Sequence, residues 1–436
     1  MKLPVSEEYI NSVLKGLDIS DVSQTTIRQC VSVSETIERQ IGEKFIHLEL
    51  GVPGLPACPI GIKAHKEALD KGVSSQYPAI GGIKELKQNA SEFIKAFVGI
   101  DVAPSCIVPT VGGMQGSYNL FLECSQITPG KDRILFIDPG FAANHTQMNV
   151  LGINSESFDI YNYRAENLRP KLEEILSKGN ISAIIYSNPN NPAWICLSES
   201  ELKDIGECAN KYDVIVLEDM AYLCMDFRRD LSQPFQPPYQ PTVANYTDNY
   251  ILMLSASKIF SYAGERIAIM AFSPTLFNRE YPALKERYGI GKMGDNYILT
   301  YLYCASSGVS HSAQYALAQM LKESTEGKYN FVKYLNEYGR RAKMAKDIFL
   351  KHGFNLVYDK DLNEKISDGF FFTAGYNNMP NKLLLTYLLR CGIIAITLNT
   401  TGSSQNGIRV CISQLNTPEH FNILDERLAM FKQIVG

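Results

Sequence analysis

From about residue 45 onward, short apolar runs alternate with amphipathic stretches along the chain. The apolar runs are rich in Val, Ile, Leu and Phe and are typical of buried strands, whereas the stretches between them have helical spacing. The runs are CIVPTV, DRILFID, SAIIYSN, DVIVLED, YILMLSAS and RIAIMAF, and the helix-like segments include MQGSYNLFLECSQI and SESELKDIGECANKY. Strands that alternate with helices form a mostly parallel sheet covered on both faces. The pattern therefore predicts a large α/β domain over residues 46–325.

The chain on either side of this region has a different pattern. Residues 1–45 are polar with helical spacing, and residues 322–338 are strongly charged and are also predicted to be helical. Beyond them stand a helix-like segment, YGRRAKMAKDIFLKHG, four strand-like runs, FNLVYD, GFFFTA, GIIAITL and IRVCISQ, and a closing helix near residues 419–435. We therefore expect an N-terminal helical segment over residues 1–45 and a smaller α+β domain over residues 326–436.

Composition narrows the class of protein. The formal net charge is -4, which argues against a nucleic-acid-binding protein, because those usually carry a basic excess. The ten cysteines include no CxxC pair and no Cys/His spacing typical of zinc, so we expect buried thiols and no metal site. The N-terminus lacks the apolar core of a secretory signal, and no apolar run approaches the ~20 residues that a membrane span needs. We expect a cytoplasmic protein that binds neither membranes nor nucleic acid.

The segment SASKIFSYAGER contains the first candidate for chemistry. Lys258 follows an apolar strand-like run and is flanked by the small hydroxyl residues Ser255 and Ser257, with Arg266 further along. The alternative for a lone lysine here is a surface residue after a strand. With an arginine nearby, the two serines and Arg266 would form a compact phosphate site, because a guanidinium makes paired, charge-assisted hydrogen bonds to phosphate.

A second phosphate-binding element is predicted in IVPTVGGMQGSYNLF. Here a strand, a Gly-Gly turn and a helix follow one another, and backbone N–H groups at a helix start form a ready anion site. Gly112 and Gly113 would let the chain approach a phosphate closely, and Met114 would contribute only its backbone N–H. Strand-to-helix turns often use glycine for other reasons, so this motif alone is weak.

Two further strand ends carry polar residues. Asp219 closes the apolar run DVIVLED, and an acid in that place is costly unless it has a cationic partner or caps a turn. A protonated pyridine nitrogen would be such a partner, and Tyr222, three residues on, would reach the phenolic oxygen of the same ring. Asn191 lies in SNPNNP, which by itself marks a turn, but its side chain would also donate to that phenolic oxygen.

Taken together, these segments resemble the class I/II aminotransferases, the fold-type I pyridoxal-phosphate-dependent enzymes that include aspartate aminotransferase. The pieces occur in the family's order, and the resemblance spans about residues 48–413, nearly the whole chain. It implies that the α/β domain binds pyridoxal 5'-phosphate and that Lys258 forms the aldimine with it. The activity implied is transfer of an amino group between an amino acid and a 2-oxo acid, with Lys258, Asp219 and Tyr222 as the catalytic residues.

The resemblance adds four positions that the residues alone do not single out. Tyr77, in QYPAIGGIKELK, matches the tyrosine that reaches the phosphate in the partner subunit, which implies a homodimer. Phe141, in DPGFAANH, matches the aromatic residue that stacks on the pyridine ring, although ordinary core packing is the alternative. Gly51 and Arg409, in LELGVPGLP and NGIRVCIS, match the positions that bind the substrate carboxylate together with Asn191.

The sequence departs from the family pattern in three places. Ala193 and Trp194 stand where a Thr-Gly pair is usual, Met114 replaces a hydroxyl residue that often lines the phosphate, and the tyrosine often seen near Asn144 is missing. These changes affect the expected substrate contacts more than the cofactor site. A dicarboxylate substrate would need a second cation in the pocket, and no single residue stands out for that role. Arg287 and Lys292 are candidates, with a solvated surface charge as the alternative for both.

Two other functions stay open. A lyase of the same fold, such as a carbon–sulfur β-lyase, would use every residue named above. A non-catalytic regulatory relative would keep the fold, but such regulators carry an added DNA-binding domain, and residues 1–45 are too short and too weakly basic for one.

Overall fold

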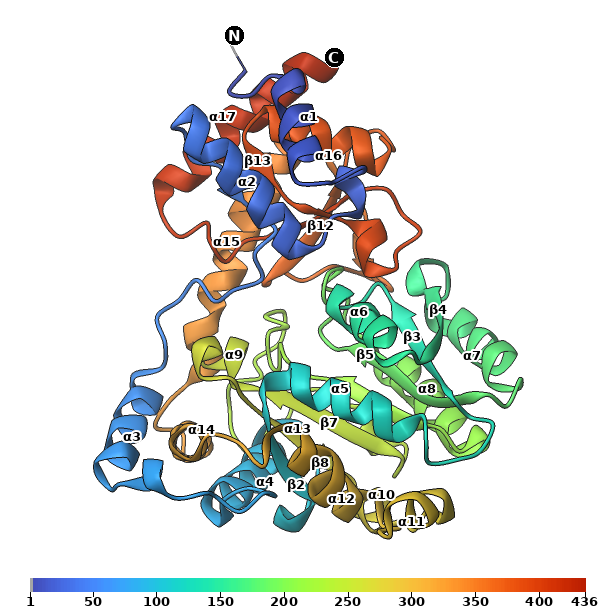
Figure 1. Cartoon of the computed structure of the whole chain (residues 1–436). Helices are drawn as coiled ribbons and strands as arrows, with labels where there is room; N and C mark the ends of the chain where they lie inside the picture. The colour runs from blue at the N-terminus through green and yellow to red at the C-terminus, as the bar shows by residue number, and fades with distance from the viewer. Residues whose placement is uncertain (1–2) are drawn as a thin grey trace.

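The computed structural model describes residues 3–436, which form two lobes (Figure 1). The larger lobe is built on a seven-stranded sheet with the strand order β2-β8-β7-β6-β5-β3-β4. Its strands are β2 (Ile107–Val111), β3 (Arg133–Asp138), β4 (Asn154–Asp159), β5 (Ile181–Ser187), β6 (Ile215–Asp219), β7 (Tyr250–Ser255) and β8 (Ile267–Phe272). Most of their side chains are buried, which explains why the central strands are nearly continuous apolar runs.

Six of the seven strands share one direction, and β8 runs against them. β3 pairs in parallel with β4 and β5, and β5, β6 and β7 continue in parallel, whereas β8 is antiparallel to both of its neighbours, β7 and β2. The expected mostly parallel sheet is confirmed. One consequence is that the end of β2, the ends of β3, β5, β6 and β7, and the beginning of β8 all lie at the same edge of the sheet.

Helices cover this sheet. α5 packs on β2, β5, β7 and β8, α8 packs on β6, and α14 packs against α3, α4 and β8. The helices of this lobe are α3 (Pro59–Asp70), α4 (Lys84–Val98), α5 (Gly112–Cys124), α6 (Ala142–Leu151), α7 (Leu168–Leu176), α8 (Glu199–Tyr212), α9 (Ala256–Ile259), α10 (Pro274–Asn278), α11 (Pro282–Tyr288), α12 (Met293–Asn296), α13 (Tyr303–Ser306) and α14 (His311–Thr325). α8 begins with a capping box, in which Ser198 and Glu201 each bind the other's backbone N–H.

The smaller lobe contains an antiparallel sheet with the order β14-β15-β12-β9, as expected for an α+β unit. Its strands are β9 (Asn355–Leu356), β12 (Phe371–Gly375), β14 (Ile396–Thr397) and β15 (Ile408–Cys411), and its helices include α16 (Asn381–Arg390) and α17 (Pro418–Val435). A two-stranded hairpin, β10 (Lys360–Asp361) and β11 (Glu364–Lys365), stands apart from this sheet.

The N-terminal segment packs on the smaller lobe rather than on the sheet that follows it in sequence. α1 (Glu7–Gly16) and α2 (Ile27–Ile41) lie beside α16 (Figure 1), and β1 (Ile46–His47) pairs in parallel with β13 (Ile393–Ile394). Apolar residues on α1 and α2 share a buried cluster with Leu385, Leu389, Ile394 and Ile396. The expected helical character is present, and Met1 and Lys2 lie outside the described residues.

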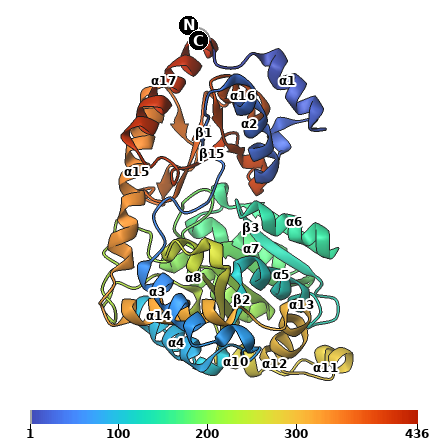
Figure 2. The same ribbon diagram turned by 60° about the vertical axis from the view of Figure 1, so that its left-hand side comes forward.

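One sequence expectation is wrong in part. The predicted helix over residues 322–338 is two helices, because α14 ends at Thr325 and α15 (Phe331–Lys351) begins after a break. Gly327 in the break has a φ of +71°, and the Asn330 side chain accepts a 2.8 Å hydrogen bond from the Lys333 N–H to cap the new helix. α15 then runs from the larger lobe into the smaller one (Figures 1 and 2).

Across residues 3–436, every helix falls short of the length and apolar character that a membrane crossing requires.

Candidate active site

The sheet brings the predicted site segments to one edge. Asp219, the last residue of β6, is paired in register with Ser187 of β5 on one side and with Met253 of β7 on the other. Asn191 and Lys258 lie a few residues beyond these strands. The strand ends of a parallel sheet therefore place the turn, the acid and the lysine next to one another, which is where ligands bind in open α/β folds.

Gly112 and Arg266 meet at this edge although 154 positions separate them in sequence. Val111, at the end of β2, pairs with Ile267, at the start of β8, so the residues just outside the strands are neighbours. Gly112 has a φ of +67°, and a Cβ there would collide with the Arg266 guanidinium, whereas a Cβ at Gly113 would meet only open space. A guanidinium beside the glycine start of a helix is an arrangement that fits a phosphate.

The serines and Met114 complete the surroundings of this corner. The Ser257 N–H donates a 3.2 Å hydrogen bond to Ser255 Oγ at the start of α9, and Ser255 is buried. The Met114 side chain is 37% exposed, and its backbone carbonyl accepts a 2.8 Å hydrogen bond from Gln147 Nε2. Met114 therefore places an exposed apolar side chain beside this corner, where the family often has a hydroxyl group.

Lys258 lies within the site on α9, directly after β7. Burial lowers the pKa of its amine to about 8. Its Nζ donates a hydrogen bond to the Gly51 carbonyl and lies 5.2 Å from the centre of the Phe370 ring. A lysine with this pKa is partly neutral near physiological pH, as a nucleophile or a general base must be.

Asp219 has few partners for a partly buried carboxyl group. It accepts a 3.0 Å hydrogen bond from the Ala221 N–H, and burial raises its pKa to about 6. A cation placed against this carboxylate would stabilise its ionised form. A protonated pyridine nitrogen fits that requirement.

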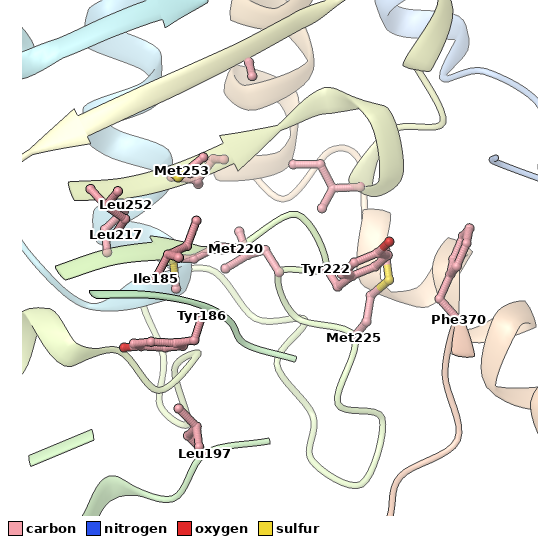
Figure 3. Close-up of a cluster of buried hydrophobic side chains, with 14 of the residues drawn as sticks. Ile185, Tyr186, Leu197, Leu217, Met220, Tyr222, Met225, Leu252, Met253 and Phe370 are labelled. Atoms are coloured by element: carbon pink, nitrogen blue, oxygen red, sulfur yellow. The ribbon is translucent and has the colours of Figure 1, made fainter. Parts of the chain in front are cut away.

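Tyr222 is surrounded by aromatic side chains. Its ring centre lies 5.3 Å from that of Trp194 and 5.5 Å from that of Phe370, and Figure 3 shows Tyr222 on the side of the buried cluster that faces Phe370. Trp194, the departure from the family pattern, is fully buried, has a φ of +63°, and donates a 2.9 Å hydrogen bond from Nε1 to Ser367 Oγ. The indole replaces a small residue by filling the space beside Tyr222.

Arg409 on β15 comes to the site from the smaller lobe. It is 2% exposed, its Nη1 donates a 3.2 Å hydrogen bond to Asn191 Oδ1, and its Nη2 donates to the Glu49 carbonyl. Burial lowers the pKa of the guanidinium, and Nε is buried with no hydrogen-bond partner among the residues that the structure describes. A substrate carboxylate would supply the missing negative charge.

Within the described part of the chain, four predicted residues make no hydrogen bond to the residues around Lys258. Phe141 follows β3 at the same edge of the sheet and is half-buried. Tyr77 is 92% exposed, and Arg287 and Lys292 are exposed at the surface of the larger lobe. Within this single chain, the structure therefore brings neither Tyr77 nor the two candidate cations against Lys258.

The sequence did not single out three residues that the site contains. Phe370 and Phe371 lie beside Lys258 and Arg409, but GFFFTA has the pattern of any buried strand. Glu49 is fully buried, and His47 Nδ1 lies 2.8 Å from its carboxylate. Burial alone would lower the pKa of His47, but the neighbouring Glu49 and Glu38 raise it overall. The one available signal was an acid inside the apolar segment IHLEL.

Known proteins similar to this chain identify its family. The family profile "Aminotransferase class I and II" matches residues 43–425. The chain belongs to the class I and II aminotransferase family. It is an aminotransferase, and the family typically uses pyridoxal phosphate. Among residues 3–436, no group of His, Cys, Asp and Glu side chains is arranged to hold a metal ion.

Curated relatives of this aminotransferase carry different substrate names. The chain is 28% identical to an aspartate aminotransferase of Pyrococcus horikoshii over 311 residues, which is 70% of this chain and 75% of the relative. It is 24% identical over 421 residues to the (5-formylfuran-3-yl)methyl phosphate transaminase of Methanocaldococcus jannaschii, covering 93% and 96% of the two chains.

Solved structures show the same fold. An aminotransferase from Mycobacterium tuberculosis superposes with a TM-score of 0.76 at 16% identity, covering 94% of this chain and 96% of the other. A double mutant of Thermus thermophilus aspartate aminotransferase gives a TM-score of 0.73 at 18% identity, covering 93% and 96%. At these identities the likeness establishes the fold alone.

Proposed function

We propose that this aminotransferase binds pyridoxal phosphate covalently at Lys258 and transfers an amino group from an amino acid to a 2-oxo acid. The observation that carries the proposal is the position of Lys258. Its amine, with a pKa of about 8, lies at the sheet edge where Arg266 and Gly112 form a corner suited to phosphate and where Asp219 ends the adjacent strand.

Each residue has a role that follows from its chemistry. Gly112, Gly113 and Met114 offer backbone N–H groups to the phosphate, and Arg266, Ser255 and Ser257 add side chains. Asp219 would hold the proton on the ring nitrogen, Asn191 and Tyr222 would bind the phenolic oxygen, and Phe141 would pack against the ring. When bound, the cofactor supplies an electron sink for the bonding pair left on the substrate α-carbon.

The substrate is held at one end and deprotonated at the other. Arg409, with Asn191 and the backbone of Gly51, binds the α-carboxylate. The neutral Lys258 amine would accept the proton from the substrate α-carbon as a general base, and the ammonium so formed would then serve as the general acid.

We also propose that the enzyme is a cytoplasmic homodimer in which Tyr77 reaches the phosphate of the partner. Tyr77 and Tyr303 are 92% and 53% exposed, and the chain beside Tyr77 contacts the start of α14, where His311 Nδ1 is 3.2 Å from the Gln76 carbonyl. Such exposed aromatic residues are typical of a covered interface. All ten cysteines are free thiols, which fits a reducing compartment. Light scattering of the purified protein tests the dimer, and a fluorescent fusion tests the location.

Borohydride trapping tests the cofactor site. The protein is loaded with pyridoxal phosphate, reduced with borohydride, digested and analysed by mass spectrometry. A phosphopyridoxyl group on Lys258, and none in Lys258→Ala, is the expected result. Label on another lysine would overturn the assignment.

A substrate panel then tests the reaction. The loaded enzyme is incubated with single amino acids, with and without 2-oxoglutarate. Formation of glutamate only in the presence of 2-oxoglutarate supports transamination. Release of pyruvate and ammonia without an oxo acid would instead identify a lyase of the same fold.

A further inference from the structure

Three side chains on α15 bind the backbone of one loop. Tyr334, Tyr338 and Arg341 stand at positions i, i+4 and i+7, so they share one face of the helix. Opposite this face is the segment GVPGLP, residues 51–56, which we call the active-site loop. We call the three side chains the latch.

The latch satisfies successive polar groups of the loop. The Tyr338 hydroxyl accepts hydrogen bonds of 3.0 and 3.2 Å from the N–H groups of Gly54 and Leu55. The Tyr334 hydroxyl donates a 3.1 Å hydrogen bond to the Pro56 carbonyl. Arg341 Nη1 donates to the Gly54 carbonyl at 3.5 Å and to the Ser413 carbonyl at 2.9 Å. The loop lacks helix and strand, so side chains take the place of regular backbone pairing.

The other end of the loop touches both functional groups of the site. The Gly51 carbonyl accepts the hydrogen bond from Lys258 Nζ, and a Cβ built on Gly51 would lie 3.8 Å from Arg409 Nη2. Gly54 is packed so closely that a Cβ would collide with the carbonyl of Ser413, which follows β15. The loop therefore lies between the latch and the space where a substrate carboxylate would sit.

The latch residues are themselves firmly held. Tyr338 is fully buried, with its ring centre 4.7 Å from that of Phe370, and Arg341 is 5% exposed. Glu337 accepts a 3.0 Å hydrogen bond from Arg341 Nε, which keeps the buried charge paired. α15 packs on α9, which carries Lys258, and also on β12 and α17 of the smaller lobe. The helix passes between the lobes (Figure 2), so contacts with both lobes fix the position of the latch.

We propose that Tyr334, Tyr338 and Arg341 are positioning residues that fix the active-site loop and thereby set the affinity for the amino-acid substrate. The inference rests on the proposed function, because it takes Arg409 as the carboxylate-binding residue. A loop that is already ordered loses little conformational entropy when substrate binds, whereas a loosened loop must be ordered at the expense of affinity. None of the three side chains needs to contact the reacting atoms.

Tyr338→Phe is the main test, carried out on the enzyme loaded with pyridoxal phosphate. The variant keeps the buried ring but leaves the Gly54 and Leu55 N–H groups without their acceptor. Hydrogen exchange in peptides that cover residues 48–58 should accelerate about tenfold, and KM for the best amino acid should rise by about tenfold, with kcat within about twofold of wild type.

Matched variants guard against a general loss of folding. Tyr288→Phe removes a hydroxyl bonded to Gln126 in the larger lobe, and Lys343→Ala removes an exposed side chain from α15 itself. Both should leave loop exchange and KM unchanged. Tyr334→Phe removes a single bond to the loop and should have a smaller effect than Tyr338→Phe in the same direction.

Two results would overturn the latch. One is loop exchange in Tyr338→Phe equal to that of wild type, and the other is a fall in kcat with KM unchanged. The exchange measurement needs no turnover, so it separates this inference from the proposed function. Faster loop exchange supports the latch even in a preparation that fails to transaminate, and in that case the proposed function is what fails.

Discussion

The guanidinium of Arg409 lies 4.6 Å from the centre of the Phe371 ring, so the two side chains stack within the site. They come from the adjacent strands β15 and β12, where Phe371 pairs with Cys411. The ring covers one face of the guanidinium, and Asn191 and the Glu49 carbonyl take two of its N–H donors. The charge is thus held in one orientation in a buried site, which strengthens its attraction for an anion.

Arg409→Lys should weaken substrate binding while leaving the cofactor in place. A lysine keeps the charge but loses the stacking on Phe371 and the paired geometry that suits a carboxylate. We expect kcat/KM for amino acids to fall by about 100-fold, mainly through KM. Steady-state kinetics measure the fall, and borohydride labelling of Lys258 should be unchanged. If KM of the variant equals that of wild type, Arg409 does not bind the substrate carboxylate.

Asp219→Asn should stabilise the cofactor-free protein and weaken the loaded one. The folded-state pKa of about 6 lies above the ordinary value near 3.9, so the ionised carboxyl disfavours folding above pH 6. Asparagine lacks that cost, and its advantage should shrink as the pH falls from 6 towards 4, because the aspartic acid is then neutral in the folded state and about half neutral in the unfolded state.

Thermal unfolding at pH 8 and pH 4 tests this sign. The Tm of cofactor-free Asp219→Asn should exceed that of wild type by a few degrees at pH 8, and most of that difference should be lost at pH 4. Pyridoxal phosphate should raise the Tm of the variant less than that of wild type, because the ring nitrogen loses its anionic partner. An equal rise in both proteins would contradict the role given to Asp219.

The pH dependence of the Lys258 amine is a third prediction. Only the neutral amine is a nucleophile, and with a pKa of about 8 it should be half neutral at pH 8. In the cofactor-free protein, the rate of reductive methylation of Lys258 should rise through a midpoint near pH 8 and level off above pH 9. Mass spectrometry of a digest gives the rate, with the exposed Lys71 as the reference amine. A midpoint near 10 would show that burial does not act on this lysine.

Gly369→Ala should be strongly destabilising, because a Cβ there would overlap the indole ring of Trp194. Overpacking of this kind typically costs about 1–3 kcal/mol. Trp194→Leu empties the same space, so Gly369→Ala should cost less in the Trp194→Leu background than in wild type. Urea unfolding of the two single variants and the double variant completes the cycle. Additive costs would show that the two positions do not share that space.

The sequence predicted those site residues that directly follow, or end, an apolar strand. Lys258, Asp219, Asn191 and Gly112 each stand within a few residues of an apolar run, and a parallel sheet brings such ends together whatever lies between them. The strand β4 gave no such signal, because NSESFD is a largely exposed edge strand without an apolar run. The reversed direction of β8 was also invisible in its composition.

Contacts between the lobes could not be predicted in the same way. The tyrosines of α15 have the spacing of any helix face, and only the course of that helix between the lobes shows that they meet the loop at residues 51–56. The break between α14 and α15 was missed because residues 326–330 include Glu326 and Lys328, whose charges continue the pattern of the flanking helices.

The pairing of β1 with β13 also governs the order in which the chain can fold as it is made. Residues 46–47 and the apolar faces of α1 and α2 leave the ribosome well before their partners, which include Leu385 and Ile394 and are synthesised more than 300 residues later. The seven-stranded sheet can form in the meantime, since its strands all lie between residues 107 and 272. The lobe that carries Arg409 therefore completes its packing only after residues 385–396 have been made, and until then the apolar faces of α1 and α2 lack the partners that bury them.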